Sequence, residues 1–282
     1  MSPAALKSAL REKLGDIEPT QNSKVTPLWA RSLSQVQVEA LTIETDPGIT
    51  VPVYVLKPAE SSRSPMPVEV AVAQAGRSQF LAQRSNEILA LLRRQVAVCL
   101  PDVRDTGEPA AKPSRGPEAM DLAATEFMLG QTSTRRTFHS GGILSRKRML
   151  SISNLIKRNA RVRSRRAASG RAPKGPLGSM AGVYEDHVDA IAARGGLTSF
   201  LSVLEDRFCH VPEDVVVPGI LQTADVPDII EAQSMRPVLL ERFVGGRNRP
   251  ARPAVNGAPG LTIREATSDG ELAQWLVTHS GY

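Results

Sequence analysis

The chain has 282 residues, enough for one large α/β domain or two small ones, and 41% of them are hydrophobic, which supports a buried core and excludes a wholly disordered chain. The formal net charge of +6 comes from one place. Residues 132–182 contain 13 Lys and Arg and no Asp or Glu, which leaves 22 of the 35 basic residues against all 29 acidic ones elsewhere. The protein is therefore an acidic globular chain with one basic segment, and its net charge alone does not indicate nucleic-acid binding.

The two cysteines, Cys99 and Cys209, are too few for a disulfide framework and lack the spacing of metal ligands. No run approaches the roughly 20 apolar residues that a membrane span needs. The first 15 residues mix charges into apolar positions, which favours an amphipathic helix over a signal peptide. We therefore expect no metal, no cofactor and no membrane partner, and by default a cytoplasmic location; the sequence does not indicate an oligomeric state.

The first half of the chain alternates strand and helix patterns. Residues 36–44 and 49–56 alternate apolar and polar side chains around the turn residues Asp46-Pro47-Gly48, which predicts a β-hairpin. A valine-rich strand is expected at 68–73, an amphipathic helix at 80–94 and a buried strand at 96–100. This order is typical of a parallel sheet with helical crossovers.

The pattern resumes in the last hundred residues. Strands are predicted at 188–192, 237–244 and 261–264, and helices at 224–232 and 270–277. The fold class is therefore α/β, with a mainly parallel sheet and an N-terminal β-hairpin, interrupted by a basic central segment. We divide the chain into a helix and linker (1–35), a first half-domain (36–131), the basic segment of low order (132–182) and a second half-domain (183–282).

Five stretches in this order, VPVYVLKP, VAVAQAG, VAVCLPDVRDTGE, VDAIAARGGLTSF and PVLLERFV, resemble the acetyl xylan esterase and dienelactone-hydrolase-like branch of the α/β hydrolases. The resemblance covers residues 41–131 and 184–275. It implies a serine hydrolase that cleaves small-molecule or carbohydrate esters. Such an enzyme carries its serine in a G-x-S-x-G turn, with a backbone oxyanion hole and then an acid and a histidine in that chain order.

The turn after the valine-rich strand provides candidates for the oxyanion hole. The backbone N–H groups of Ala75, Gly76 and Arg77 follow that strand directly, although an ordinary strand-to-helix turn would have the same sequence. The nucleophile is not found, because no serine has glycine at both −2 and +2. The serines that come nearest to the pattern are Ser78, Ser140, Ser169 and Ser179.

The acid and the base are equally hard to place. Gly245-Gly246-Arg247-Asn248 stands where the resemblance leads us to expect an acid, and Asp225 or Asp228 could replace it only by an unusual route. The loop at 266–270, where the histidine should lie, has none. The four histidines, each interpreted as a surface or packing residue, are His139, His187, His210 and His279. We therefore expect an esterase-related protein that is inactive or impaired, with no assignable catalytic residue.

Three interpretations of residues 132–182 remain open. The segment could be a disordered basic arm for nucleic acid or an anionic surface, which would make the chain a non-catalytic binding protein; only Phe138 could stack on a base, so nucleic acid is disfavoured. It could be an insertion into a working hydrolase. It could also be translated out of frame, which we prefer, because family-like sequence stops and resumes sharply and acidic residues vanish. On that interpretation the sheet should be weakened or split.

Overall fold

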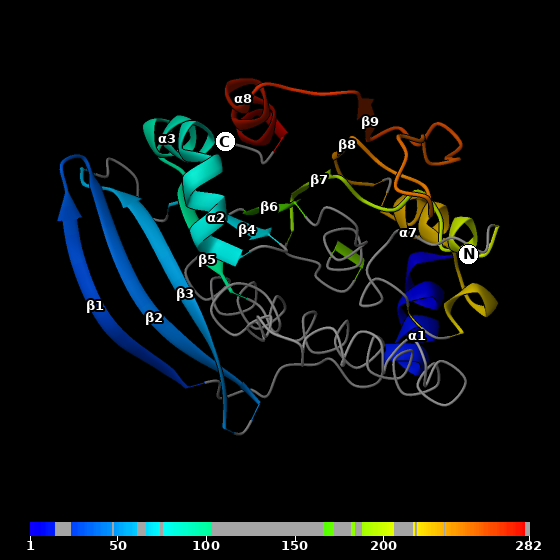
Figure 1. Ribbon diagram of the computed structural model, residues 1–282, viewed down its shortest axis with the longest axis horizontal. Coiled ribbons are helices and arrows are strands. Elements are labelled where there is room, and N and C mark those ends of the chain that lie inside the picture. The colour runs from blue at the N-terminus through cyan, green and yellow to red at the C-terminus, as the bar shows by residue number, and fades with distance from the viewer. Residues whose placement is uncertain are drawn as a thin grey trace, which may run out of the picture.

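A computed structural model of the protein describes residues 1–14, 24–46, 48–60, 66–73, 76–102, 166–171, 182–183, 188–205, 217, 219–233 and 235–279. These residues form a nine-stranded sheet in the order β1-β2-β3-β5-β4-β6-β7-β8-β9, with helices on both faces (Figure 1). The strands are β1 (Val25–Leu33), β2 (Val36–Asp46), β3 (Ile49–Pro58), β4 (Val68–Ala73), β5 (Ala97–Pro101), β6 (Arg166–Arg171), β7 (Ala190–Arg194), β8 (Val238–Glu241) and β9 (Leu261–Arg264). The helices are α1 (Pro3–Leu14), α2 (Gly76–Gln83), α3 (Ser85–Arg93), α7 (Val226–Glu231) and α8 (Asp269–His279), with 3₁₀ turns η1 (Leu201–Val203) and η3 (Ile220–Gln222).

The sheet is mixed and mainly parallel, as the sequence predicted. The pairs β1–β2, β2–β3 and β3–β5 are antiparallel, whereas β4–β5, β4–β6, β6–β7, β7–β8 and β8–β9 are parallel. The predicted N-terminal hairpin is confirmed as β2 and β3. The bounds of β4 and β9 agree with the predicted ones.

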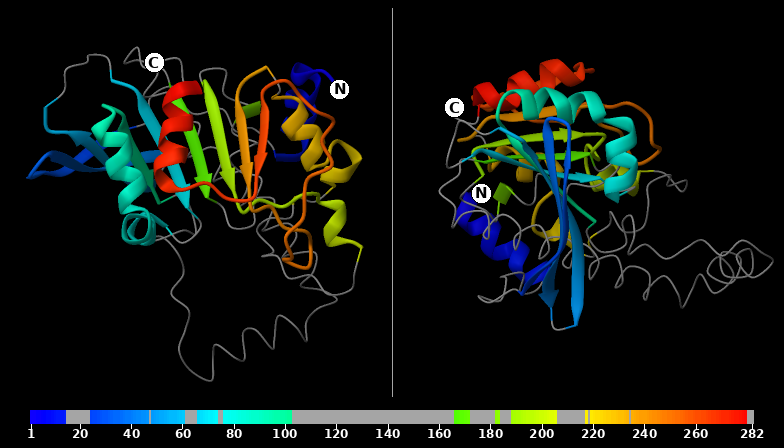
Figure 2. Two further views of the ribbon diagram at one scale, coloured as in Figure 1. Left: turned by 90° about the horizontal axis from the view of Figure 1, so that it is seen from above. Right: turned by 90° about the vertical axis from the view of Figure 1, so that its left-hand side faces the viewer.

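Each face of the sheet carries its own hydrophobic core. Helices α2, α3 and α8 cover one face, while α1 and α7 lie against the other (Figure 2). Successive residues of β7 alternate between these cores: Ala190 and Ala192 face α3 and α8, and Ile191 faces α1 and α7. Strands buried on both faces need no polar alternation, which explains the continuous apolar runs in the sequence. Helix α1 belongs to the domain, because Leu6 and Leu10 are buried in the core.

Three elements differ from expectation. Strand β1 was not predicted, because VTPLWARSL contains a proline and its side chains are nearly all exposed. The single helix expected at 80–94 is two helices, α2 and α3, which meet at Arg84, a residue with non-helical dihedral angles (φ −126°, ψ 23°). Strand β8 ends at Glu241 rather than at 244, so that a carboxylate stands at its carboxyl end.

Strand β6 lies inside the basic segment and corrects one prediction. Its six residues, RAASGR, pair in parallel with β4 on one side and with β7 on the other. The expectation of a split sheet is therefore wrong at this position. Pairing in a parallel sheet uses backbone N–H and C=O groups, which any non-proline residue supplies, so the lack of large apolar residues in this sequence does not prevent it. Residues 132–165 and 172–181, on which the prediction of low order rests, lie outside the described residues, as does the predicted first-half boundary at 131.

Candidate active site

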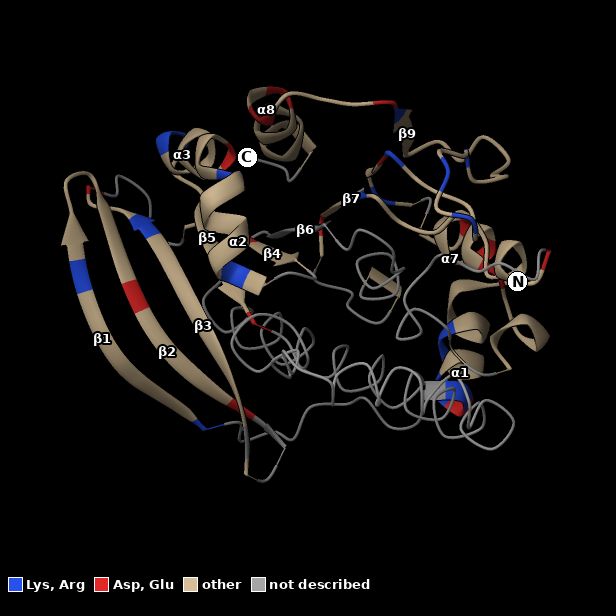
Figure 3. Ribbon diagram, in the orientation of Figure 1, with Lys and Arg blue, Asp and Glu red and all other residues tan. Residues whose placement is uncertain are grey.

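The carboxyl ends of the parallel strands define the edge of the sheet where ligands bind in open α/β folds. Two clusters of charged side chains occupy this edge in the described residues. The first joins the end of β5 to the start of α2. The second joins the ends of β7 and β8 to the starts of α3 and α8, where acidic and basic positions occur together (Figure 3).

The first cluster consists of Arg77 and Asp102. Gly76 begins α2 with φ +82°, a conformation that favours glycine. The backbone N–H of the next residue, Arg77, donates to Asp102 Oδ1 at 2.6 Å. The guanidinium Nη1 of Arg77 lies 3.5 Å from Asp102 Oδ2, and both side chains are buried. Asp102 therefore fixes the start of α2 against the end of β5.

This geometry bears on the predicted oxyanion hole. The Arg77 N–H already donates to a carboxylate, so it faces a negative charge inside the protein. An oxyanion donor must instead be directed at the place where charge develops in the substrate. Ala75 lies outside the described residues, and Gly76 is described as the buried first residue of α2. The oxyanion prediction stays a prediction, and it now rests on Ala75 and Gly76.

The second cluster is centred on Arg194, the last residue of β7. Arg194 Nε donates to Glu241 Oε2 at 2.6 Å, and its Nη1 donates to Glu87 Oε2 at 3.3 Å. Its Nη2 donates to the backbone oxygen of Thr267 at 3.2 Å, and the Thr267 hydroxyl donates to Glu241 Oε1. The exposed fractions of Arg194, Glu87 and Glu241 are 6%, 3% and 1%, so water hardly reaches these charges.

Arg84 completes this cluster. Its Nη1 lies 2.5 Å from Asp269 Oδ1, which is also 3.6 Å from Arg194 Nη1. We call Arg84, Glu87, Arg194, Glu241, Thr267 and Asp269 the Arg194 cluster. Two guanidinium groups and three carboxylates thereby connect two strands and two helices. In the sequence, this cluster is marked by charged residues at the ends of otherwise apolar strands, namely Arg194 in β7 and Glu241 in β8.

No family model matches the sequence, and no curated protein matches it. Solved structures do resemble the chain. A candidate acetyl xylan esterase from Bacteroides fragilis NCTC 9343 superposes with a TM-score of 0.64 at 16% identity, over 94% of this chain and 74% of that one. Acetyl xylan esterase 1 from a Thermoanaerobacterium species gives 0.62 at 12% identity, over 100% and 95% of the two chains. The acetyl xylan esterase from Paenibacillus sp. R4 gives 0.57 at 14% identity, over 98% and 94%.

The chain has the α/β-hydrolase fold of these esterases. At such low identity the likeness establishes the fold alone, and any catalytic activity must be argued from the side chains of the site. In an α/β hydrolase the nucleophilic serine lies on the turn that follows a central parallel strand. In this sheet β6 is a central parallel strand, between β4 and β7. Residues 172–181 after β6, which include Ser179, lie outside the described residues. Ser169 lies within β6 itself rather than after it.

A cysteine does not replace the serine in the described part of this α/β-hydrolase fold. Cys99 lies in β5, 1% exposed, and faces the core beside α1 and α7. Burial raises the pKa of its thiol from an ordinary 9.0 to about 12, because the charged thiolate loses its hydration. At neutral pH the side chain is therefore a thiol, and the thiolate is the nucleophilic form.

The alternative acids have structural roles. Asp225 caps α7, where it accepts the N–H of Val226 at 2.7 Å, and it also accepts the hydroxyl of Ser199. Asp228 accepts the backbone N–H of Asp225 at 2.7 Å and so completes a capping box. Both carboxylates are therefore occupied at the start of one short helix.

The loop after β9, where the resemblance led us to expect a histidine, contains none. Thr267 stands in that loop and donates its hydroxyl to Glu241 at the end of β8. Among the described residues the histidine is His279, whose Nδ1 lies 2.8 Å from the Trp275 oxygen at the far end of α8. His139, His187 and His210 lie outside the described residues. The described part of the chain contains no group of three His, Cys, Asp or Glu side chains arranged for a metal, nor a helix long and apolar enough to cross a bilayer.

Proposed function

We propose that this chain is an esterase-type α/β-hydrolase protein that receives small-molecule or carbohydrate esters at the carboxyl edge of its sheet, and that its turnover by a serine–histidine–acid mechanism is impaired. The fold shared with acetyl xylan esterases supports a carboxylic ester as the ligand, with acetylated carbohydrate as the first class to test. The observation that carries the impairment is the contact of Thr267 and Arg194 with Glu241.

The chemistry of this contact explains the expected loss. A serine hydroxyl is a poor nucleophile until a base takes its proton. A threonine hydroxyl cannot accept a proton at neutral pH as an imidazole can. Glu241, the buried carboxylate at the end of β8, is neutralised by Arg194 and so is not available to orient a base. Proton transfer by a positioned side chain typically contributes about 10²–10⁴-fold to a rate, and this contribution should be missing.

An assay with p-nitrophenyl acetate and with an acetylated xylo-oligosaccharide tests the proposal. The Thermoanaerobacterium acetyl xylan esterase serves as a positive control of the same fold. We expect saturation-transfer NMR to detect binding of the oligosaccharide, while acetate release stays at least about 10²-fold below that of the control. Saturable turnover that a fluorophosphonate abolishes would contradict the impairment. A failure to bind either ester would contradict the assignment of an ester ligand.

A further inference from the structure

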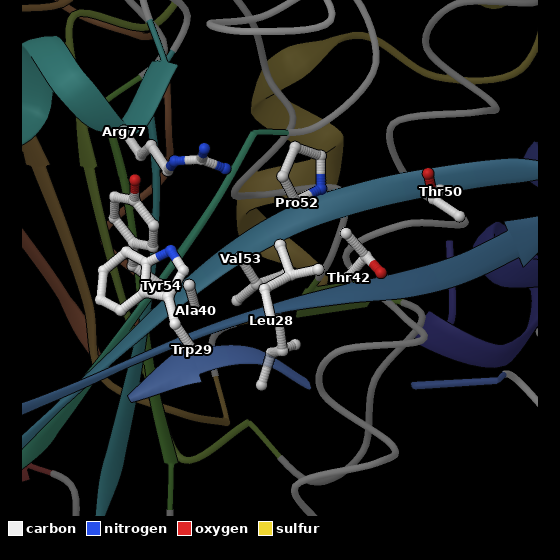
Figure 4. A pocket seen from close by; sticks show the side chains of 10 residues that line it. Leu28, Trp29, Ala40, Thr42, Thr50, Pro52, Val53, Tyr54 and Arg77 are labelled. Atoms are coloured by element: carbon white, nitrogen blue, oxygen red, sulfur yellow. The ribbon is translucent and has the colours of Figure 1, made fainter. Parts of the chain in front are cut away.

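A cavity of about 430 Å³ lies between the antiparallel strands β1–β3 and the start of α2 (Figure 4). The volume lies within the range of about 300–1,000 Å³ that is typical of small-molecule sites. We call this cavity the hairpin pocket. Its wall combines aromatic, aliphatic and hydroxyl-bearing side chains, among them Leu28, Trp29, Thr42, Thr50, Pro52 and Tyr54.

The strand register places the hydroxyl-bearing side chains on one face of the hairpin. Every second side chain of a strand points to the same side, so Thr50, Pro52 and Tyr54 share one face of β3. Thr42 of β2 pairs directly with Pro52 and therefore lies on that face as well. Figure 4 shows Thr42 and Thr50 toward one end of the pocket and Tyr54 toward the other.

Two aromatic rings stand at the Tyr54 end of the same face. Ala40 of β2 pairs with Trp29 of β1 on one side and with Tyr54 of β3 on the other. The two rings meet across this small residue, with their centroids 5.5 Å apart. Ala40 is 2% exposed, whereas Trp29 keeps 38% of its surface exposed. The indole ring is therefore packed on one side and available to a ligand on the other.

The pocket also offers groups that can form hydrogen bonds. The hydroxyls of Thr42, Thr50 and Tyr54 and the indole N–H of Trp29 make no hydrogen bond to another residue within the described part of the chain. A hydroxyl both donates and accepts, and the indole N–H donates. Thr42 and Tyr54 are half-buried, so a ligand that replaces water at these groups must itself supply hydrogen-bond partners.

Arg77 also lines the pocket, as a fixed part of its wall. Its guanidinium carbon lies 4.1 Å from the centroid of the Tyr54 ring, and its Nη1 lies 3.5 Å from Asp102 Oδ2. Its side chain is 8% exposed. The positive charge is therefore already balanced inside the protein, and the pocket does not require an anionic ligand.

We propose that the hairpin pocket binds an uncharged sugar ring. One face of a pyranose consists of C–H groups, which pack against the exposed side of Trp29. Its rim carries hydroxyls, which exchange hydrogen bonds with Thr42 and Thr50. A wholly apolar molecule fits this wall less well, because it would cover these threonine hydroxyls without satisfying them.

This inference rests on the proposed function and names the part of the ligand that the pocket holds. Arg77 follows Gly76, a candidate for the oxyanion hole, at the start of α2. Val53 of the pocket wall pairs with Pro101 at the carboxyl end of β5. The pocket thus lies at the carboxyl edge of the sheet, where we propose that the ester binds. The sugar ring is then the carbohydrate part of that ester.

Xylotriose is a suitable probe, because it carries neither an ester nor a charge. Xylitol has similar hydroxyls without a ring and serves as the control ligand. In saturation-transfer NMR we expect titratable binding of xylotriose, with the largest transfer to the C–H groups on one face of a ring, and binding of xylitol at least about tenfold weaker. Equal binding of the two compounds, or no binding of xylotriose, would overturn the proposal.

Variants of β1 test the contact with the indole. Trp29→Ala removes the ring, and Leu33→Ala truncates a residue of the same strand that is 60% exposed and does not line the pocket. We expect Trp29→Ala to weaken xylotriose binding at least about tenfold, Trp29→Phe to restore most of the affinity, and Leu33→Ala to leave it within about twofold. Equal affinities of Trp29→Ala and Leu33→Ala would refute a site in this pocket.

A second set of variants tests the hydroxyls. Thr42→Val and Thr50→Val remove a hydroxyl and keep the branched shape of the side chain. Thr262→Val makes the same change in β9, at the opposite end of the sheet. We expect each of the first two to weaken xylotriose binding about threefold to tenfold and the third to leave it within about twofold. Full affinity in a Thr42→Val/Thr50→Val double variant would contradict a sugar and favour an apolar ligand.

The pocket and the ester can fail separately. If Trp29→Ala binds an acetylated xylo-oligosaccharide as well as the unchanged protein does, the pocket is not the sugar site, and the proposed ester function stands. If xylotriose binds and Trp29→Ala abolishes this binding, the sugar site stands even when p-nitrophenyl acetate neither binds nor is cleaved.

Discussion

The antiparallel and the parallel parts of the sheet differ in what their side chains contribute. Strand β1 exposes eight of its nine residues and is held mainly by backbone pairing with β2. In β5, β7 and β8 every residue is buried, and the ends of β7 and β8 are joined by the Arg194 cluster. Antiparallel strands can face water on one side, whereas parallel strands are covered on both. The exposed side chains of the antiparallel part can therefore be replaced with little effect on the fold. The stability of the parallel part, in contrast, depends on nearly every side chain that it buries.

Removing the central cation of the parallel part should have the largest effect. Arg194→Met removes the guanidinium that contacts the buried carboxylates of Glu87 and Glu241, which should lower the free energy of unfolding by about 3–5 kcal/mol. Arg31→Met on exposed β1 is the matched control and should change it by less than about 0.5 kcal/mol. Urea unfolding followed by circular dichroism measures both, and similar losses for the two variants would abolish the distinction between the two parts.

The reactivity of Cys99 tests the burial of the parallel part. A pKa of about 12 instead of 9.0 lowers the thiolate fraction about 1,000-fold at pH 8. In a Cys209→Ser background we expect iodoacetamide to label Cys99 about 1,000-fold more slowly than it labels the unfolded chain. In the same background Ser32→Cys on β1 should react at nearly the rate of a free thiol, because this position is exposed. Rapid labelling of Cys99 without unfolding would show that β5 is not covered on both faces.

Truncation of one leucine in each part of the sheet should have the next largest effect on stability. Leu239 in β8 is fully buried. Leu239→Ala should therefore lower the free energy of unfolding by about 3 kcal/mol, because apolar burial is lost and a cavity is left behind. Leu33 in β1 is 60% exposed, and Leu33→Ala should cost less than about 0.5 kcal/mol. Thermal unfolding of the two variants under one set of conditions makes the comparison. A large loss in Leu33→Ala would mean that β1 is covered by a partner in solution.

The smallest effect should come from the start of α8, the helix that covers the parallel part. The backbone N–H and the hydroxyl of Ser268 both donate to Glu271 and lower the pKa of that carboxyl. A lowered pKa in the folded state stabilises the protein above the unfolded value of about 4.3, and the contribution is lost as pH falls through the folded pKa. The decrease in urea midpoint from pH 6 to pH 3 should therefore be slightly smaller in Glu271→Gln than in the unchanged protein. Glu265→Gln, an exposed neighbour, controls for the loss of one charge.

The parts of the fold that the sequence predicted are those encoded by neighbouring residues. The β2–β3 hairpin follows from alternation around a turn, and α7 lies within the helix predicted at 224–232. The fold class was predicted from the order of such elements and from resemblance. Strand β6 was not predicted, because its sequence, RAASGR, has no strand pattern of its own. Its position is set by backbone pairing with β4 and β7.

The Arg194 cluster could not be read from the sequence for the same physical reason. Arg194 meets Glu241 across 47 positions, Thr267 across 73 and Glu87 across 107. Such contacts are decided by strand order, which no local pattern contains. The predicted oxyanion hole meets the same limit, because the Arg77 N–H donates to Asp102, 25 positions away, and no local pattern indicates that contact.

The position of β6 has a consequence for how the chain assembles. Val68 in β4 pairs with Arg166 in β6, so the middle of the sheet can close only after roughly a hundred residues have been brought together. The ladder β1–β3 and the β4–β5 unit need only short-range encounters, and β7–β9 pair among themselves. We expect two separately collapsing halves during synthesis, with strand edges β4 and β7 left open until β6 enters between them. That interval, rather than the finished molecule, is when this protein is most exposed to misassembly.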